Sequence, residues 1–416
     1  LATIKLQRLF YESHYPLGMH LRFRNQRRSQ VTPFSIVYVY LPMRPSWHIR
    51  LRKTGHLISS YQRYRVNIFH FLQVHTIKTA IILANLGTPD EPTAPAIKRY
   101  LAEFLSDPRV VNLPRSIWLP ILHGVILKTR PKKLTHNYSM IWGTHDGPIR
   151  NITAALTRRV AKYFKRKYPE RDLHFYTAMT YGNPAIKSIL NQAQDDGCSE
   201  FLIIPLYPQY AGATTGAVFD KWVTATDDQI VPNFRFISEY HTHPKYIHGL
   251  TKSIEKYNKK LIAGAHLLFS FHGIPMSQND AGDPYASQCQ ETARRVAHAL
   301  GLTKDQWSVA FQSKFGPAAW LTPATIDQMR AFPTAGKKDL LVICPGFSVD
   351  CLETIEEIKV ENQDAFLAAG GDAFQYVKAL NATQDHVALM VALVEEHLFD
   401  RELRGRTPPR VNLNQF

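Results

Sequence analysis

The sequence predicts an α/β protein built on two parallel, doubly wound sheets with a cleft between them. Two observations carry this prediction. From Thr79 onward, apolar β-rich runs alternate with helical patterns, and the runs fall into two series of four. Short connections between such runs are typical of βαβ units, whose parallel strands are covered by helices on both faces. The two series predict two similar domains, residues 79–244 and 245–400, with a boundary near Pro244.

Each expected strand is a short run of aliphatic, aromatic or β-branched residues. The first series comprises residues 79–86, 173–181, 200–207 and 234–240. The second series comprises residues 266–271, 307–312, 338–344 and 374–379. Helical patterns between and after these runs include residues 149–165, 184–194, 245–262, 287–300 and 384–399.

Composition indicates a globular protein of the cytoplasm. Hydrophobic residues make up 45% and charged residues 20% of the 416 residues, and the four cysteines are spaced too far apart for a disulfide framework. The formal charge of +16 is concentrated in residues 1–78, which carry 13 Lys and Arg against the single acid Glu12. The remaining 338 residues hold only +4, so the charge does not predict a nucleic-acid-binding face.

The basic leader, residues 1–78, shows no sustained strand or helix period, and we expect no stable fold before Thr79. Its arginine-rich, nearly acid-free composition partly fits an organellar transit peptide. A translated upstream region or a misplaced start explains the same composition. Since no apolar run reaches ~18 residues, we expect no transmembrane helix.

The segment 113–133, LPRSIWLPILHGVILKTRPKK, interrupts the strand and helix alternation. One interpretation is an ordinary amphipathic helix that packs on the core. The other is a lip that dips an apolar edge into a bilayer while its basic flank faces anionic headgroups, with peripheral attachment to the inner membrane. The residues expected to insert are Trp118, Leu119, Ile121 and Leu122, and the basic flank comprises Lys128, Arg130, Lys132 and Lys133.

The stretch 266–275, HLLFSFHGIP, holds the first candidate for chemistry. Its apolar run predicts a strand buried on both faces, and Gly273 with Pro275 ends it. His272 is therefore expected where the strand ends at its carboxyl edge, which is where ligands bind in open α/β sheets. The alternative is a histidine that only bonds backbone beside a turn.

Four further motifs follow expected strand ends and bring aromatic and aliphatic side chains toward this histidine. They are NLGT at 85–88, YPQY at 207–210, QSKFG at 312–316 with Trp320, and PGFS at 345–348. Each motif alone is also consistent with an ordinary turn, because Gly and Pro are common in turns. Together they indicate a pocket for a large, flat aromatic ligand.

The helix expected after Ser348 carries three carboxylates at a spacing of four residues, Glu353, Glu357 and Glu361. In a regular helix they form one stripe, where like charges repel unless water, protons or a cation intervene. A structural alternative exists for Glu353, because Asp350-x-x-Glu353 reads as a capping box. A solvated face accommodates the whole stripe equally well.

The chain contains the motifs FHGIP, LYPQY with TTG, QSKFG-x-x-x-W, ICPGFSVDCLETIEEI, NLGTPDEPT and YGNP. With these motifs the sequence resembles the ferrochelatases over residues 79 to about 400, most of all the proteobacterial branch. It implies two Rossmann-like, chelatase-type domains and an enzyme that inserts Fe²⁺ into protoporphyrin IX, the final step of haem biosynthesis. Ferrous iron is then a substrate.

The resemblance also implies roles for single residues. His272 and Glu353 fall on the catalytic positions and are the candidate metal ligands, and Glu357 and Glu361 fall on further acidic positions. The implied porphyrin contacts are Leu86, Tyr181, Tyr207, Gln209, Tyr210, Ser270, Trp320 and Phe347. Two departures stand out: Thr180 occupies a position where many relatives have arginine, and Cys351 one where animal enzymes have histidine.

Some relatives hold a [2Fe–2S] cluster through cysteines of a C-terminal extension. No cysteine follows Cys351, so the tail 401–416 lacks such ligands and we expect no cluster. Alternatives that stay open are a coproporphyrin chelatase, a chelatase for another metal or tetrapyrrole, and a haem carrier without catalysis. The acidic stripe argues against the carrier. A periplasmic binding protein of similar shape is disfavoured because no signal peptide is recognisable.

Overall fold

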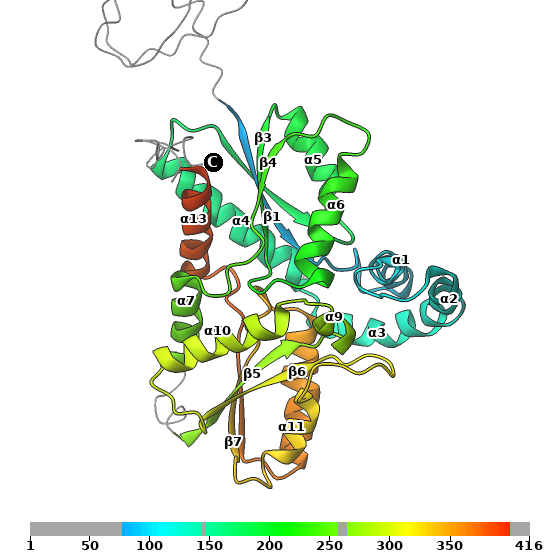
Figure 1. The fold of residues 1–416 in the computed structure, drawn as a ribbon, viewed down its shortest axis with the longest axis vertical. Helices are drawn as coiled ribbons and strands as arrows, with labels where there is room; N and C mark the ends of the chain where they lie inside the picture. Colours follow the sequence, from blue (N-terminus) through cyan, green and yellow to red (C-terminus); the bar gives the residue numbers. More distant parts are fainter. Residues whose placement is uncertain (1–76, 144–145, 257–263, 400–416) are drawn as a thin grey trace, which may run out of the picture. The chain divides into compact units, whose positions relative to one another are not determined.

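The computed structural model describes residues 77–143, 146–256 and 264–399. Within them the strands form two four-stranded parallel sheets flanked by helices, which confirms the predicted fold class (Figure 1). The predictions for the basic leader and for the tail concern residues that lie outside these ranges, apart from Ile77 and Lys78. The first sheet has the order β2-β1-β3-β4. Its strands are β1 (Thr79–Asn85), β2 (Leu173–Met179), β3 (Glu200–Pro205) and β4 (Asn233–Phe236).

The second sheet repeats this order as β6-β5-β7-β8. Its strands are β5 (His266–His272), β6 (Trp307–Gln312), β7 (Asp339–Ile343) and β8 (Ala373–Val377). In both sheets the earliest strand lies between the next two, so the chain leaves it first on one side and then on the other. Such a reversal opens a crevice at the carboxyl ends of the strands, where ligands bind. The NLGT and HGIP motifs follow β1 and β5 and therefore lie at these two reversal points.

Helices cover both faces of each sheet. In the first half they are α1 (Ala94–Ser106), α2 (Arg115–Ile121), π-helix η2 (Leu122–Ile126), α3 (Leu127–Ile141), α4 (Pro148–Lys167), α5 (Ile186–Asp195), π-helix η3 (Gly212–Gly216) and α6 (Ala217–Ala225). In the second half they are α7 (Pro244–Glu255), α9 (Met276–Asp280), α10 (Tyr285–Ala299), α11 (Thr325–Ala331), π-helix η4 (Glu353–Asn362), α12 (Gln363–Ala368) and α13 (Gln384–Leu398).

One hydrophobic core joins the two sheets. All seven residues of β1 are buried, as expected for a strand covered on both faces. Leu83 of β1 and Phe269 of β5 belong to the same buried cluster, together with residues of α4, α7, α10 and α13. Figure 1 shows α13 beside α4 and above α7, and these helices are in contact. The boundary near Pro244 stays a prediction: α7 begins there, but the shared core crosses it.

The segment 113–133 forms α2, η2 and the first part of α3, and it corrects part of the predicted bilayer edge. Trp118 and Leu122 are buried rather than exposed, and the Trp118 indole donates to the Leu105 carbonyl at 2.7 Å. A local apolar run does not show which of its side chains face the core. Here Trp118 and Leu122 pack in one buried cluster with residues of α1. No helix of the described ranges is long and apolar enough to cross a bilayer.

Candidate functional site

His272 is the last residue of β5, and it is half-buried near two aromatic side chains. The ring centroids of Trp320 and Phe347 each lie 6.5 Å from the centre of its imidazole. Its Nδ1 lies 2.7 Å from the Gly273 carbonyl oxygen. Because a carbonyl only accepts, Nδ1 of the neutral ring carries the hydrogen, and Nε2 keeps the lone pair that can take up a proton.

Glycine directly after this histidine allows a close approach of the chain to its neighbours. A Cβ on Gly273 would approach both the Gln312 carbonyl oxygen and the Trp320 ring to 3.1 Å. Gly273 also donates its backbone N–H to that carbonyl, which ties the loop after β5 to the end of β6. The close approach of backbone and indole therefore sets where Trp320 lies relative to His272.

Glu353 begins η4 and lines a small pocket at the edge of the first sheet. The pocket is formed by Leu86, Gly87, Thr88, Tyr100, Tyr138, Ile141, Pro148, Ile149, Cys351, Leu352 and Glu353. Burial, and then the nearby Glu353 charge, raises the pKa of the Cys351 thiol well above its ordinary value. Burial likewise raises the pKa of the Tyr138 hydroxyl, with Glu353 as the next cause. The carboxylate thus stands among neutral, largely apolar neighbours.

Glu357 lies one turn further along η4 and is held by the end of β6. Its carboxylate accepts the Ser313 backbone N–H at 2.7 Å and the Ser313 hydroxyl at 2.5 Å. The Gln312 side-chain amide lies 3.5 Å from the same carboxylate and 3.0 Å from the Glu353 carbonyl oxygen. Burial raises the pKa of Glu357, while the Ser313 bond and the attraction of His272 oppose that rise.

The acidic stripe runs outward along η4. Glu353 and Glu357 are half-buried, and Glu361 is exposed. The segment that carries them is a π-helix over Glu353–Asn362 rather than the regular helix we expected. π-Helical turns are rare and are frequently found at functional sites.

The predicted capping box at Asp350 and Glu353 is wrong. Leu352 is the residue that precedes η4, and its side chain makes no capping hydrogen bond. The buried Asp350 carboxylate instead accepts from the Tyr376 hydroxyl at 2.7 Å and from the Asn381 amide at 2.7 Å. Glu353 therefore has no capping role in this structure, which removes the structural alternative for that residue.

The structure brings Trp320 and Phe347 to His272, and Leu86 to Glu353. Tyr207 and Tyr210 are half-buried at the end of β3. The other implied contacts are filled by protein partners. Tyr181 donates to Asp107 at 2.9 Å, Gln209 to Thr292 at 2.9 Å, and Ser270 to Gln312 at 2.8 Å, and all three side chains are buried. Their assignment as porphyrin contacts stays a prediction.

Several groups around the site were not assigned a role from the sequence. Gln312 and Ser313 stood in the QSKFG motif, but nothing local indicated that they reach η4. Arg130 of α3 was predicted to belong to the basic flank that faces the headgroups, but it is half-buried and stacks over the Phe315 ring, with its guanidinium carbon 4.5 Å from the ring centroid. This contact links the 113–133 segment to the loop after β6. Tyr138 had no sequence signal. Thr180 is buried and its hydroxyl bonds the Asn85 carbonyl at 3.1 Å.

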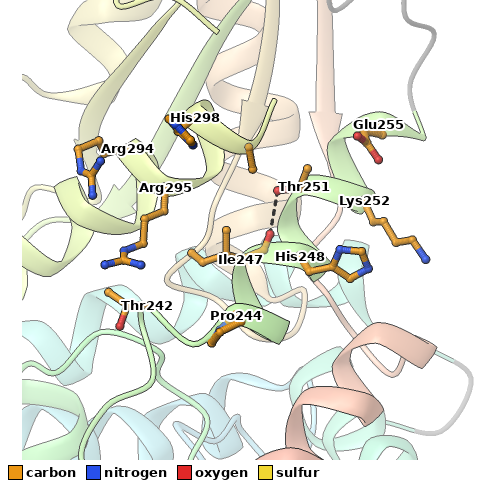
Figure 2. Close-up of a pocket in the computed structure, with 11 residues that line it drawn as sticks. Thr242, Pro244, Ile247, His248, Thr251, Lys252, Glu255, Arg294, Arg295 and His298 are labelled. Atoms are coloured by element: carbon orange, nitrogen blue, oxygen red, sulfur yellow. Dashed lines mark hydrogen bonds between the residues drawn. The ribbon is translucent and has the colours of Figure 1, made fainter. Parts of the chain in front are cut away.

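A second pocket of about 720 Å³ lies between α7 and α10, away from all of these residues (Figure 2). Figure 2 shows its two walls, with Ile247, His248, Thr251, Lys252 and Glu255 on one and Arg294, Arg295 and His298 on the other. Its positive charges are largely paired. Arg294 and Arg295 both bond Glu291, at 2.7 and 2.6 Å, and Lys252 lies 3.8 Å from Asp385.

Within the described ranges, no group of three or more His, Cys, Asp and Glu side chains gathers in a way that could hold a metal ion. His272 lies at the end of β5, whereas Glu353 and Glu357 both lie on η4.

The comparisons place the chain among named proteins. The family model described as Ferrochelatase matches residues 78–398. The chain is 43% identical to a ferrochelatase of Marinobacter nauticus, over 80% of this chain and 90% of that protein. It is 43% identical to one of Aeromonas hydrophila, over 77% and 98%, and 46% identical to one of a Polaromonas species, over 75% and 85%. Among solved structures, the sirohydrochlorin chelatase SirB of Bacillus subtilis matches 79% of this chain and 98% of its own, with TM-score 0.47 and 9% identity.

Proposed function

This chain belongs to the ferrochelatase family, and from that premise we propose that it inserts Fe²⁺ into protoporphyrin IX and releases two protons. The observation that carries the proposal is the surroundings of His272. An imidazole whose Nε2 keeps its lone pair lies with its centre 6.5 Å from the centroids of both the Trp320 and the Phe347 ring, at the point where the strand order reverses. Flat aromatic walls around one proton acceptor suit a planar tetrapyrrole whose pyrrole N–H protons must leave.

Metallation replaces two pyrrole protons with one divalent iron, so the site must accept protons while it admits a cation. A planar macrocycle hides both the N–H groups and the nitrogen lone pairs. Binding energy from the rest of the ring can bend it and expose them. His272 is our candidate for the base, because a neutral imidazole accepts protons near neutral pH.

The carboxylates supply the second half of the chemistry. Carboxylate and imidazole both suit Fe²⁺ as ligands, so Glu353 is our candidate for sharing metal delivery or proton removal with His272. Glu357 and Glu361 continue from the half-buried Glu353 to the exposed surface. We assign them to the route by which protons reach water.

The buried polar atoms of the region favour a ligand there. Trp320 Nε1 and Gln209 Oε1 are buried, and neither has a hydrogen-bond partner among the described residues. An unpaired buried donor or acceptor costs free energy until something bonds it. Protoporphyrin is our proposed substrate. Coproporphyrin and the carrier role are not favoured, because the relatives above carry the name ferrochelatase.

The protein also offers a surface for a membrane. Ile117, Ile121 and Val125 follow one another at a spacing of four residues, and these residues are 58%, 41% and 56% exposed. Lys128, Lys132 and Lys133 are exposed on the adjoining helix. We propose that this edge of the 113–133 segment rests on an anionic bilayer, with the apolar side chains inserted and the lysines at the headgroups.

We further propose that the protein works in the cytoplasm, at the inner membrane, without a resident cofactor. The described cysteines are free thiols and buried, which suits a reducing compartment. Anaerobic mixing of the purified protein with Fe²⁺ and protoporphyrin, followed by haem absorption, tests the proposed reaction.

A further inference from the structure

Ser313 has an unusual backbone for its residue type. Its φ is +64°, in the left-handed region that residues with a Cβ rarely adopt. Within the described ranges, Asn381 is the one other non-glycine residue with positive φ. Such conformations persist where surrounding contacts enforce them, and they cluster at functional sites.

The contacts that accompany this conformation all lead to Glu357. The turn at Ser313 points both its N–H and its hydroxyl at the Glu357 carboxylate, at 2.7 and 2.5 Å on different oxygens. One residue thus fixes both oxygens of the carboxylate. The preceding Gln312 is buried, and its amide donates to the Glu353 carbonyl at 3.0 Å, so η4 is held against the end of β6 at two successive levels.

The side chain of Gln312 is in turn held by a residue of β5. Its side-chain oxygen accepts the Ser270 hydroxyl at 2.8 Å, and that hydroxyl also bonds Thr325 at 2.8 Å. The network starts in β5, two residues before His272, and ends on η4. It therefore fixes the position of Glu357 relative to the strand that carries His272.

We propose that Ser313 is a positioning residue of the reaction, whose N–H and hydroxyl hold the Glu357 carboxylate toward His272 as the next proton acceptor. This inference rests on the proposed function. Ser313 would act on the reaction only through Glu357, without touching His272 or the substrate iron itself. A proton that leaves His272 for Glu357 restores the neutral imidazole, and the proton then passes to Glu361 or to water.

Two substitutions separate the hydroxyl from the backbone conformation. Ser313→Gly and Ser313→Ala both remove the hydroxyl and keep the N–H, but glycine adopts positive φ without strain whereas alanine does not. Both variants should lose turnover roughly tenfold, as expected for one hydrogen bond to a charged group, with KM for porphyrin unchanged. A Ser313→Gly enzyme with normal turnover would overturn the proposal, and so would a raised KM with unchanged turnover.

A double-mutant cycle tests whether Ser313 acts through Glu357. In the Glu357→Gln background, Ser313→Gly should reduce turnover little further, because the carboxylate that it positions is gone. Independent effects that multiply would show that Ser313 acts elsewhere, for example directly on the porphyrin.

A crystal structure of the Ser313→Gly variant gives a readout without activity. The N–H of residue 313 still holds one oxygen of the Glu357 carboxylate, so the other oxygen, which the hydroxyl held at 2.5 Å, should swing away, and an unmoved carboxylate would contradict the proposal. If the wild-type protein fails to metallate porphyrin, the proposed function is lost, yet this structure still decides whether Ser313 positions Glu357.

Discussion

His272 and Gln312 are the last paired residues of β5 and β6, so the imidazole and the amide that holds η4 leave the sheet at the same level. This pairing explains how three segments that are distant in sequence converge. β5 carries the base, β6 with Ser313 anchors Glu357, and η4 carries the carboxylates. The predictions below concern the members of this arrangement and the surfaces around it.

His272→Ala should lower turnover roughly 10²-fold or more, since a positioned general base contributes that much. Porphyrin should still bind, because Trp320 and Phe347 remain. Steady-state haem formation and porphyrin fluorescence quenching measure the two effects on one preparation. If the variant bound porphyrin weakly but metallated each bound porphyrin as fast as the wild type does, His272 would be assigned to binding instead.

Glu353→Gln keeps the size of the side chain and removes its charge. Because Glu353 caps no helix end in this structure, we expect the free energy of unfolding to change by less than about 1 kcal/mol, below the usual cost of a lost cap. Turnover should collapse if the carboxylate handles metal or protons. Urea unfolding and haem formation are measured together, and a stable, fully active variant would remove Glu353 from the mechanism.

The bilayer edge is tested by Ile117→Ser with Ile121→Ser. Each fully buried large side chain contributes on the order of 1.5–3 kcal/mol, so the double variant should bind phosphatidylglycerol vesicles at least tenfold more weakly. Val223→Ser is the matched control, because Val223 is also an exposed apolar residue, at 42%, but lies on α6, outside the 113–133 segment. Unchanged vesicle binding would favour an ordinary surface helix. Trp118→Ser should instead destabilise the fold.

A chain that begins at Ile77 should fold and retain activity. The family match starts at residue 78, and β1 begins at Thr79. Circular dichroism and haem formation, compared with the full chain, check this. If the shortened chain failed to fold, this result would show that the leader is part of the core.

Acid should destabilise the protein through His386. Burial lowers the pKa of His386 to about 4, against an ordinary value of 6.5. Between these values the unfolded chain binds more protons than the folded one, so the free energy of unfolding falls as pH falls from about 6.5 to 4. For this group the loss reaches about 3 kcal/mol. His386→Gln cannot titrate and should show a shallower pH dependence in urea unfolding, and an equal slope would contradict the assignment.

Patterns local in sequence predicted the fold well. The eight apolar runs became the eight strands of the described ranges, because strands buried on both faces must be apolar throughout. Most strands ended one to four residues away from the predicted position, since periodicity does not say where pairing stops. His272 was placed at a carboxyl edge by the turn residues that follow it.

Features that depend on contacts between distant segments could not be predicted. Nothing in LPRSIWLPIL distinguishes the buried Trp118 from the exposed Ile117, because the choice is made by packing on α1. The predicted capping box was wrong because the Asp350 carboxylate accepts hydrogen bonds from Tyr376 of β8 and from Asn381 in the loop after it. The role of Ser313 depends on β6 meeting η4, 44 residues later in the chain.

The most direct test of the account is haem formation by the purified wild-type protein, supplied anaerobically with Fe²⁺ and protoporphyrin, with His272→Ala as the matched control. We predict turnover far above the uncatalysed rate for the wild type and a loss of roughly 10²-fold or more for the variant. The same assay with coproporphyrin decides the substrate. Porphyrin that binds but is metallated no faster than in buffer would contradict the account and favour a carrier.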